Sequence, residues 1–126
     1  MSSQNSFVGA VLAALLLFVP PYLIAAPPGH SAAAQHAAKA KVLFDEGFYE
    51  LLPRGNRAAA QARFDLAVHE NHRAIELDPN FAPAYRQLAR LYHVQKRYED
   101  EVSAQREILR LRPGDVDVRV RLADTL

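Results

Sequence analysis

The sequence predicts an all-α fold of stacked antiparallel helical hairpins, a short α-solenoid, preceded by an apolar N-terminal helix. Two observations support this prediction. The stretches around Pro79 and Pro113 repeat one another after 34 residues, and a leucine stands two residues before each proline. On both sides of each proline the apolar residues recur with helical spacing. A fixed period of this length is typical of helical hairpins that stack side by side.

Charge divides the chain at Lys39. All 15 Lys and Arg residues and all 14 Asp and Glu residues lie from Lys39 onward. Their near balance gives no electrostatic case for binding nucleic acid. The absence of cysteine excludes a disulfide framework and a thiolate zinc site. We therefore divide the chain into an N-terminal hydrophobic segment (1–26), a linker (27–34) and a helical repeat domain (35–126).

The N-terminal segment contains an apolar stretch at residues 7–26, which as a helix would be about 30 Å long and so about as thick as a bilayer core. Pro20 and Pro21 interrupt it after a run that also suits the apolar part of a secretory signal. Residues 1–6 carry no Lys or Arg, and Pro27 stands where a peptidase would cut, which argues against cleavage. We expect a single-pass membrane anchor. The alternatives are a cleaved signal with an exported, periplasmic domain, and an apolar helix buried against a partner.

The first hairpin is expected to consist of two long helices. One begins near Ser31 and ends at Pro53, because the preceding proline and glycine residues are incompatible with a helix. Residues 53–56 then form a turn. The second helix runs over residues 57–77, with Asn56 as its N-cap.

The second hairpin begins near Ala82, where Pro83 suits the first turn of a helix. A short turn at residues 95–97 leads to a fourth helix over residues 98–111. The side chains that we expect to point inward from this fourth helix are Tyr98, Val102, Ile108, Leu109 and Leu111.

The last segment, residues 116–126, is ambiguous from its own pattern. Its valines alternate as in a strand, but its apolar residues also match helical spacing. Its register with residues 82–92, one period earlier, favours a helix.

With these elements in place, the chain resembles the tetratricopeptide repeat family. Residues 82–115 resemble one full repeat, residues 35–81 a repeat stretched by about eight residues counted from Gly47, and residues 116–126 a truncated one. The residues at the family's pattern positions in the full repeat are Tyr85, Leu88, Ala89, Tyr92, Tyr98, Ile108 and Pro113. Glu101 stands where the family usually has alanine, and we expect its carboxylate either to turn outward or to loosen the helix crossing.

The resemblance implies a peptide-binding groove, because in this family the first helix of each hairpin lines a concave side that holds a peptide. Our candidate groove residues are Arg86, Gln87, Arg90, His93 and Arg121. Arg86 and Arg90 are four apart and so share one helical face. They resemble the basic grooves that clamp a carboxylate, although Asp117 stands where such grooves usually have a lysine. The alternative is that the arginines only keep this face soluble.

No catalytic or metal-binding motif is visible. His69 and His72 could share one helical face, but two ligands do not make a zinc site, and surface histidines are the simpler interpretation. We therefore predict a non-enzymatic scaffold or adaptor with no cofactor and no metal. It would be anchored to a membrane through residues 7–26 and would bind a protein or a peptide, for which the arginines suggest acidic character. The alternatives are an accessory subunit of a membrane protein complex and an exported soluble repeat protein.

Overall fold

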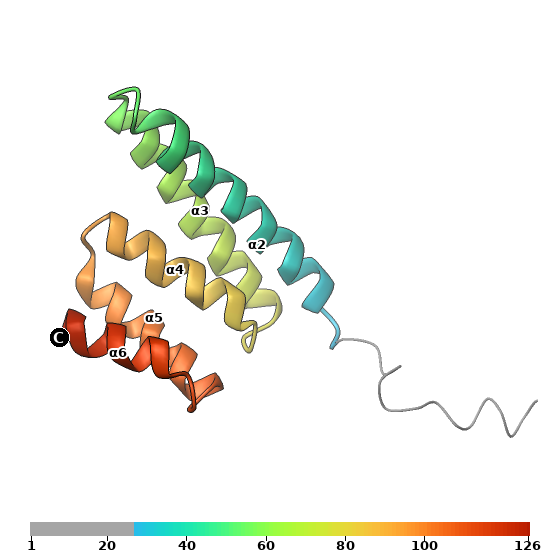
Figure 1. The fold of residues 1–126 in the computed structure, drawn as a ribbon. Coiled ribbons are helices and arrows are strands. Elements are labelled where there is room, and N and C mark those ends of the chain that lie inside the picture. Colours follow the sequence, from blue (N-terminus) through green and yellow to red (C-terminus); the bar gives the residue numbers. More distant parts are fainter. Residues whose placement is uncertain (1–26) are drawn as a thin grey trace, which may run out of the picture.

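The computed structural model describes residues 27–126, and these residues form helices without any strand (Figure 1). This confirms the all-α prediction, including a helix rather than a strand at the C-terminal end. In chain order the elements are α2 (His30–Asp45), the π-helix η2 (Glu46–Leu51), α3 (Arg57–Leu77), α4 (Ala82–Val94), α5 (Tyr98–Leu111) and α6 (Val116–Thr125).

The elements form two antiparallel hairpins and one further helix. α2 continues through η2 and packs along α3, α4 packs along α5, and α6 lies against α5 (Figure 1). Local signals set the helix ends. The side chain of Asn56 caps α3 by accepting a hydrogen bond from the Ala59 amide at 3.2 Å, and that of Asp115 caps α6 by accepting one from the Val118 amide at 3.2 Å.

Small residues let the two helices of the first hairpin approach closely. The buried residues that line this contact are mostly alanines: Ala33, Ala37 and Ala40 on α2, and Ala60, Ala67 and Ala74 on α3. At the η2 end of the first hairpin, Gly47 lies against the ring of Phe64. A Cβ added to the glycine would be only 2.7 Å from Cε1 of that ring. The π-helical turn is closed by a hydrogen bond from the Leu52 amide to the Gly47 carbonyl oxygen.

The two hairpins share a core. Leu91 of α4 is 1% exposed and belongs to the same buried cluster as Phe44 and Phe64 of the first hairpin. Phe81 and Ala84, at the start of the second hairpin, pack into another cluster with alanines of α2 and α3. The hairpins therefore nest against each other through side chains that are almost completely removed from water.

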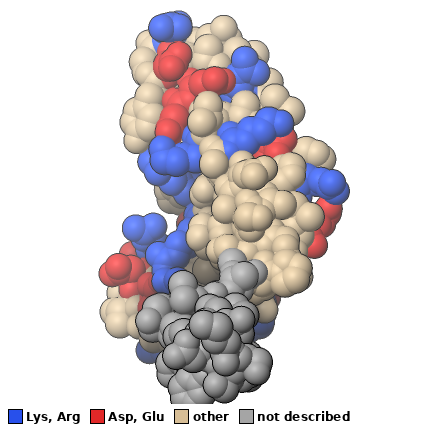
Figure 2. Space-filling model, turned by 90° about the vertical axis from the view of Figure 1, so that its right-hand side faces the viewer, with Lys and Arg blue, Asp and Glu red and all other residues tan. Residues whose placement is uncertain are grey.

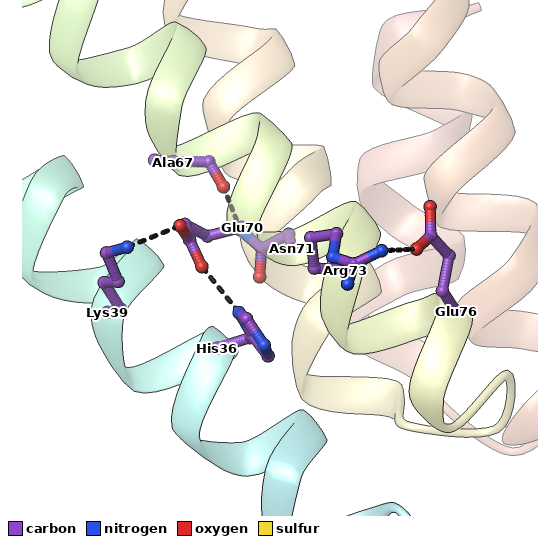
Figure 3. A network of polar contacts seen from close by, with 7 residues as sticks. All are labelled: His36, Lys39, Ala67, Glu70, Asn71, Arg73 and Glu76. Atoms are coloured by element: carbon purple, nitrogen blue, oxygen red, sulfur yellow. Dashed lines mark hydrogen bonds and ion pairs between the residues drawn. The ribbon is translucent and has the colours of Figure 1, made fainter.

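A polar contact also joins α2 to α3 (Figure 3). The carboxylate of Glu70 accepts a hydrogen bond from Lys39 Nζ at 2.7 Å and lies 2.6 Å from His36 Nδ1. Glu70 is buried, so these partners satisfy a carboxylate that would otherwise be costly to remove from water. The hydrogen bond from Lys39, followed by that from His36, lowers the pKa of Glu70 below its ordinary value of 4.5.

Replacing Glu70 with glutamine is expected to lower the free energy of unfolding at neutral pH by about 1 kcal/mol, a modest cost because Lys39 and His36 are partly in solvent. Since the folded pKa of Glu70 is depressed, this contribution is present above pH 4.5 and is lost as the pH falls through the folded pKa. Urea unfolding of both proteins across this range should show the difference shrinking below pH 4.5.

The control for that experiment is Asp45→Asn, which removes a carboxylate from α2 whose partner, Lys41, is mostly exposed. We expect it to change stability by less than about 0.5 kcal/mol at any of these pH values. A Glu70→Gln difference that stayed constant below pH 4.5 would contradict the assigned role of the Glu70 carboxylate.

One inward-facing assignment was wrong. Tyr98 was expected to point into the core, but its side chain is 50% exposed. It is the first residue of α5, at the end of the hairpin, and its ring makes an edge contact with His93, with centroids 6.3 Å apart. Ile108, from the same set, is buried.

The proposed membrane anchor at residues 7–26 and the segment boundary at residue 26 lie outside the described residues. None of the helices in residues 27–126 combines the length and apolar character needed to cross a bilayer. On the face shown in Figure 2, basic and acidic side chains lie among one another, and a broad area carries neither. The charges visible on this face therefore do not form a surface of one sign.

Candidate functional site

A cavity with a volume of about 410 Å³ lies between α4, α5 and α6. We call it the α4–α6 groove. Its polar lining comprises Arg86, Arg90 and His93 from α4, Glu101 and Gln105 from α5, and Asp117, Arg121, Asp124 and Thr125 from α6. Apolar lining is supplied by Ala89, Ile108 and Val118. Its volume lies within the range of pockets that bind small ligands or side chains.

The structure brings four of the five candidate groove residues together. Arg86, Arg90 and His93 follow one face of α4, and Arg121 reaches the same cavity from α6. Gln87 does not line it. Gln87 lies on the face of α4 that packs against the first hairpin. Its Nε2 donates a hydrogen bond to the Ala37 carbonyl oxygen at 3.1 Å.

Two of the groove arginines are held by contacts within the domain. Arg86 forms an ion pair with Asp115, the N-cap residue of α6. The guanidinium of Arg90 lies 4.4 Å from the centre of the Phe44 ring and donates a hydrogen bond to the Tyr49 hydroxyl at 3.3 Å. Arg121, by contrast, forms no ion pair within residues 27–126. It is therefore the groove arginine that is most available to a ligand.

The carboxylate of Glu101 turns inward and is 5% exposed, so the expectation that it turns outward was wrong. The other expectation, a loosened helix crossing, stays a prediction. Glu101 Oε1 accepts a hydrogen bond from Gln105 Nε2 at 3.0 Å, and its Oε2 lies 3.1 Å from His93 Nδ1. α6 lies over this part of α5, which places the side chain at the wall of the groove rather than in open solvent. Sequence reasoning missed Gln105 altogether, although its i+4 spacing from Glu101 is a signal that the two share a helical face.

Comparison with known families adds one finding. Residues 73–102 match the family model described as tetratricopeptide repeat. Over these residues the chain is similar to the tetratricopeptide repeat family, and the matched stretch is consistent with a partial repeat. The matched stretch begins near the end of α3, includes all of α4 and ends early in α5. No curated protein matches the chain.

The tetratricopeptide match agrees with the resemblance inferred from the residues. It includes the α4 wall of the groove and Glu101, whereas the α6 wall lies outside it. The match begins at residue 73 and ends at residue 102, so the stretched repeat at 35–81, the extent of the full repeat to residue 115 and the truncated repeat at 116–126 stay predictions. Tetratricopeptide repeats generally act in protein–protein interaction and are typically not enzymes.

His69 and His72, the two histidines considered for zinc, have separate surroundings. His69 is exposed, and His72 Nε2 lies 3.0 Å from the Tyr92 hydroxyl of α4. Within residues 27–126, no group of three His, Asp or Glu side chains is arranged to hold a metal ion.

Proposed function

We propose that the protein is a non-enzymatic adaptor that binds a peptide segment of a partner protein in the α4–α6 groove. The observation that supports this most directly is the cavity itself. It lies between α4, the first helix of the second hairpin, and α6, the helix that follows this hairpin, and it combines an apolar lining with polar walls. Such a combination suits a peptide, because apolar contacts supply affinity and a few polar groups fix orientation.

The test uses peptides selected by the full chain from a random phage-displayed library, with their affinities then measured by fluorescence anisotropy. Replacing Ala89 with leucine would place extra carbon atoms inside the groove. We expect this change to weaken binding of the selected peptides at least about ten-fold, whatever their charge, because it occupies the space they need.

The matched control is Ala123→Leu, the same substitution at an exposed position of α6 that does not line the groove. We expect this variant to bind like the wild type, and circular dichroism should show equal helix content in all three proteins. If Ala89→Leu and Ala123→Leu both bound the selected peptides normally, the groove would not be the binding site.

We also propose, from the sequence of residues 7–26, that the adaptor is attached to a membrane. The second candidate is an exported form from which this segment has been removed. The intact mass of the native protein distinguishes them, because an anchored protein would keep the full 14.0 kDa while an exported one would lack the mass of its N-terminal segment. Finding a native protein of reduced mass in a soluble fraction would rule out the anchor.

A third candidate is an accessory subunit of a membrane complex. Stoichiometric co-purification with other membrane proteins after detergent extraction would support a subunit. Recovery of the chain alone, with reversible peptide binding, would support the adaptor.

A further inference from the structure

We propose that the α4–α6 groove receives a basic side chain, arginine or lysine, of the partner segment at Glu101. This inference rests on the proposed function and specifies the chemistry of its ligand. It differs from the acidic partner that the arginines suggest, and the two chemistries can be separated by experiment.

Glu101 is incompletely paired within the described residues. Burying a carboxylate is costly unless a positive charge accompanies it. Its partners among the described residues are the neutral amide of Gln105 and the ring of His93, whose side chain is 66% exposed. The two arginines of α4, Arg86 and Arg90, are held by other contacts. Glu101 therefore faces the groove without a lysine or arginine partner.

A buried hydrogen-bond acceptor lies on the residue that pairs with this carboxylate. Gln105 is 2% exposed and lines the groove, yet its Oε1 makes no hydrogen bond within the described residues. Leaving a buried acceptor unsatisfied costs free energy. This oxygen has almost no accessible surface, so a ligand reaches it only after the Gln105 side chain turns toward the groove. A basic side chain, with three to five N–H donors on one charged group, then satisfies it.

The charge balance of the groove also favours a basic ligand. Asp117 and Asp124 add two carboxylates to that of Glu101. Once Arg86 is assigned to Asp115, the arginines that remain in the lining are Arg90 and Arg121, so carboxylates are in excess. A ligand carboxylate would be repelled by this set, whereas a guanidinium could bind Glu101 through two parallel hydrogen bonds.

The experiment titrates the full chain, labelled with nitrogen-15, with three capped tripeptides in which arginine, citrulline or glutamate stands between two leucines. Citrulline keeps the shape of arginine but removes its charge. We expect the arginine peptide to shift the backbone amide signals of Glu101 and Gln105. It should also bind about ten-fold more tightly than the citrulline peptide, because it forms a charge-assisted hydrogen bond that citrulline cannot form. The glutamate peptide should leave both signals unchanged.

Two variants test the residues themselves. Glu101→Gln should weaken the arginine peptide about ten-fold and leave the citrulline peptide unaffected. The control is Glu99→Gln, the same substitution at an exposed position of α5 outside the groove, which should change neither. If Glu101→Gln fails to fold, Gln105→Leu serves instead, since it removes the unpaired acceptor and keeps the size of the side chain.

Tighter binding of the glutamate peptide, with shifts centred on Arg121, would overturn this inference and leave the proposed function intact. Failure of all three tripeptides to shift the groove signals would also overturn it. The proposed function is judged separately, by the selected peptides and the Ala89→Leu variant, so the two ideas fail in different experiments.

Discussion

Replacing Leu91 with alanine is expected to lower the free energy of unfolding by about 3 kcal/mol. Leu91 is 1% exposed and is the member of α4 that completes a buried cluster with Phe44 and Phe64 of the first hairpin. Truncating it removes apolar contacts and leaves a cavity that the surrounding aromatic side chains cannot fill without moving. The substitution should therefore weaken the packing between the two hairpins.

Urea denaturation followed by circular dichroism measures this effect. The control is Leu66→Ala, because Leu66 lies on α3 but is 47% exposed and does not belong to the buried cluster. We expect the control to cost less than about 1 kcal/mol. Equal costs for the two substitutions would show that Leu91 is not buried between the hairpins.

The second large effect is expected for Gly47→Val, which should destabilise the protein by about 2 kcal/mol through overpacking. Even a Cβ at this position would lie 2.7 Å from Cε1 of Phe64, closer than van der Waals contact allows. Phe64 is 3% exposed, and its ring centre lies 5.7 Å from that of Phe44. The ring therefore has little room to retreat, and η2 must shift away from α3.

A double-mutant cycle identifies the cause of that effect. Phe64→Leu shortens the side chain that the new valine meets, so the combined variant should be more stable than the sum of the single changes predicts. Gly114→Val is the control, because a Cβ at Gly114 would meet nothing within 4 Å. Strict additivity between Gly47→Val and Phe64→Leu would mean that the two positions do not touch.

The helix boundaries could be predicted from the sequence because local chemistry sets them. Asn56 caps α3 as expected, since an asparagine side chain before a helical run accepts a hydrogen bond from the first turn. Pro79 and Pro113 follow the ends of α3 and α5 because a proline in the middle of a helix removes a hydrogen bond and clashes with the preceding turn. The repeat register then resolved the ambiguity of residues 116–126, which fold as α6 rather than a strand.

The direction of individual polar side chains could not be predicted, because it depends on which neighbour covers each helix face. Glu101 turns inward because α6 lies over that part of α5, and Gln87 leaves the groove because α2 offers a backbone acceptor on its side of α4. The π-helical η2 also escaped prediction. Within it, Gly47 lies close to Phe64, a residue of another helix, and this approach is not visible in the sequence. These features are properties of helix packing rather than of sequence spacing.

The most direct test of the stacked-hairpin architecture is a nuclear Overhauser spectrum of the full chain with the methyl groups of Leu91 assigned. The account predicts cross-peaks from these methyls to ring protons of the first hairpin, on Phe64 or Phe44, because all three side chains belong to one buried cluster. Cross-peaks confined to α4 and α5, with none to either ring, would show that the hairpins do not nest. The proposed groove would then lose the scaffold that positions it.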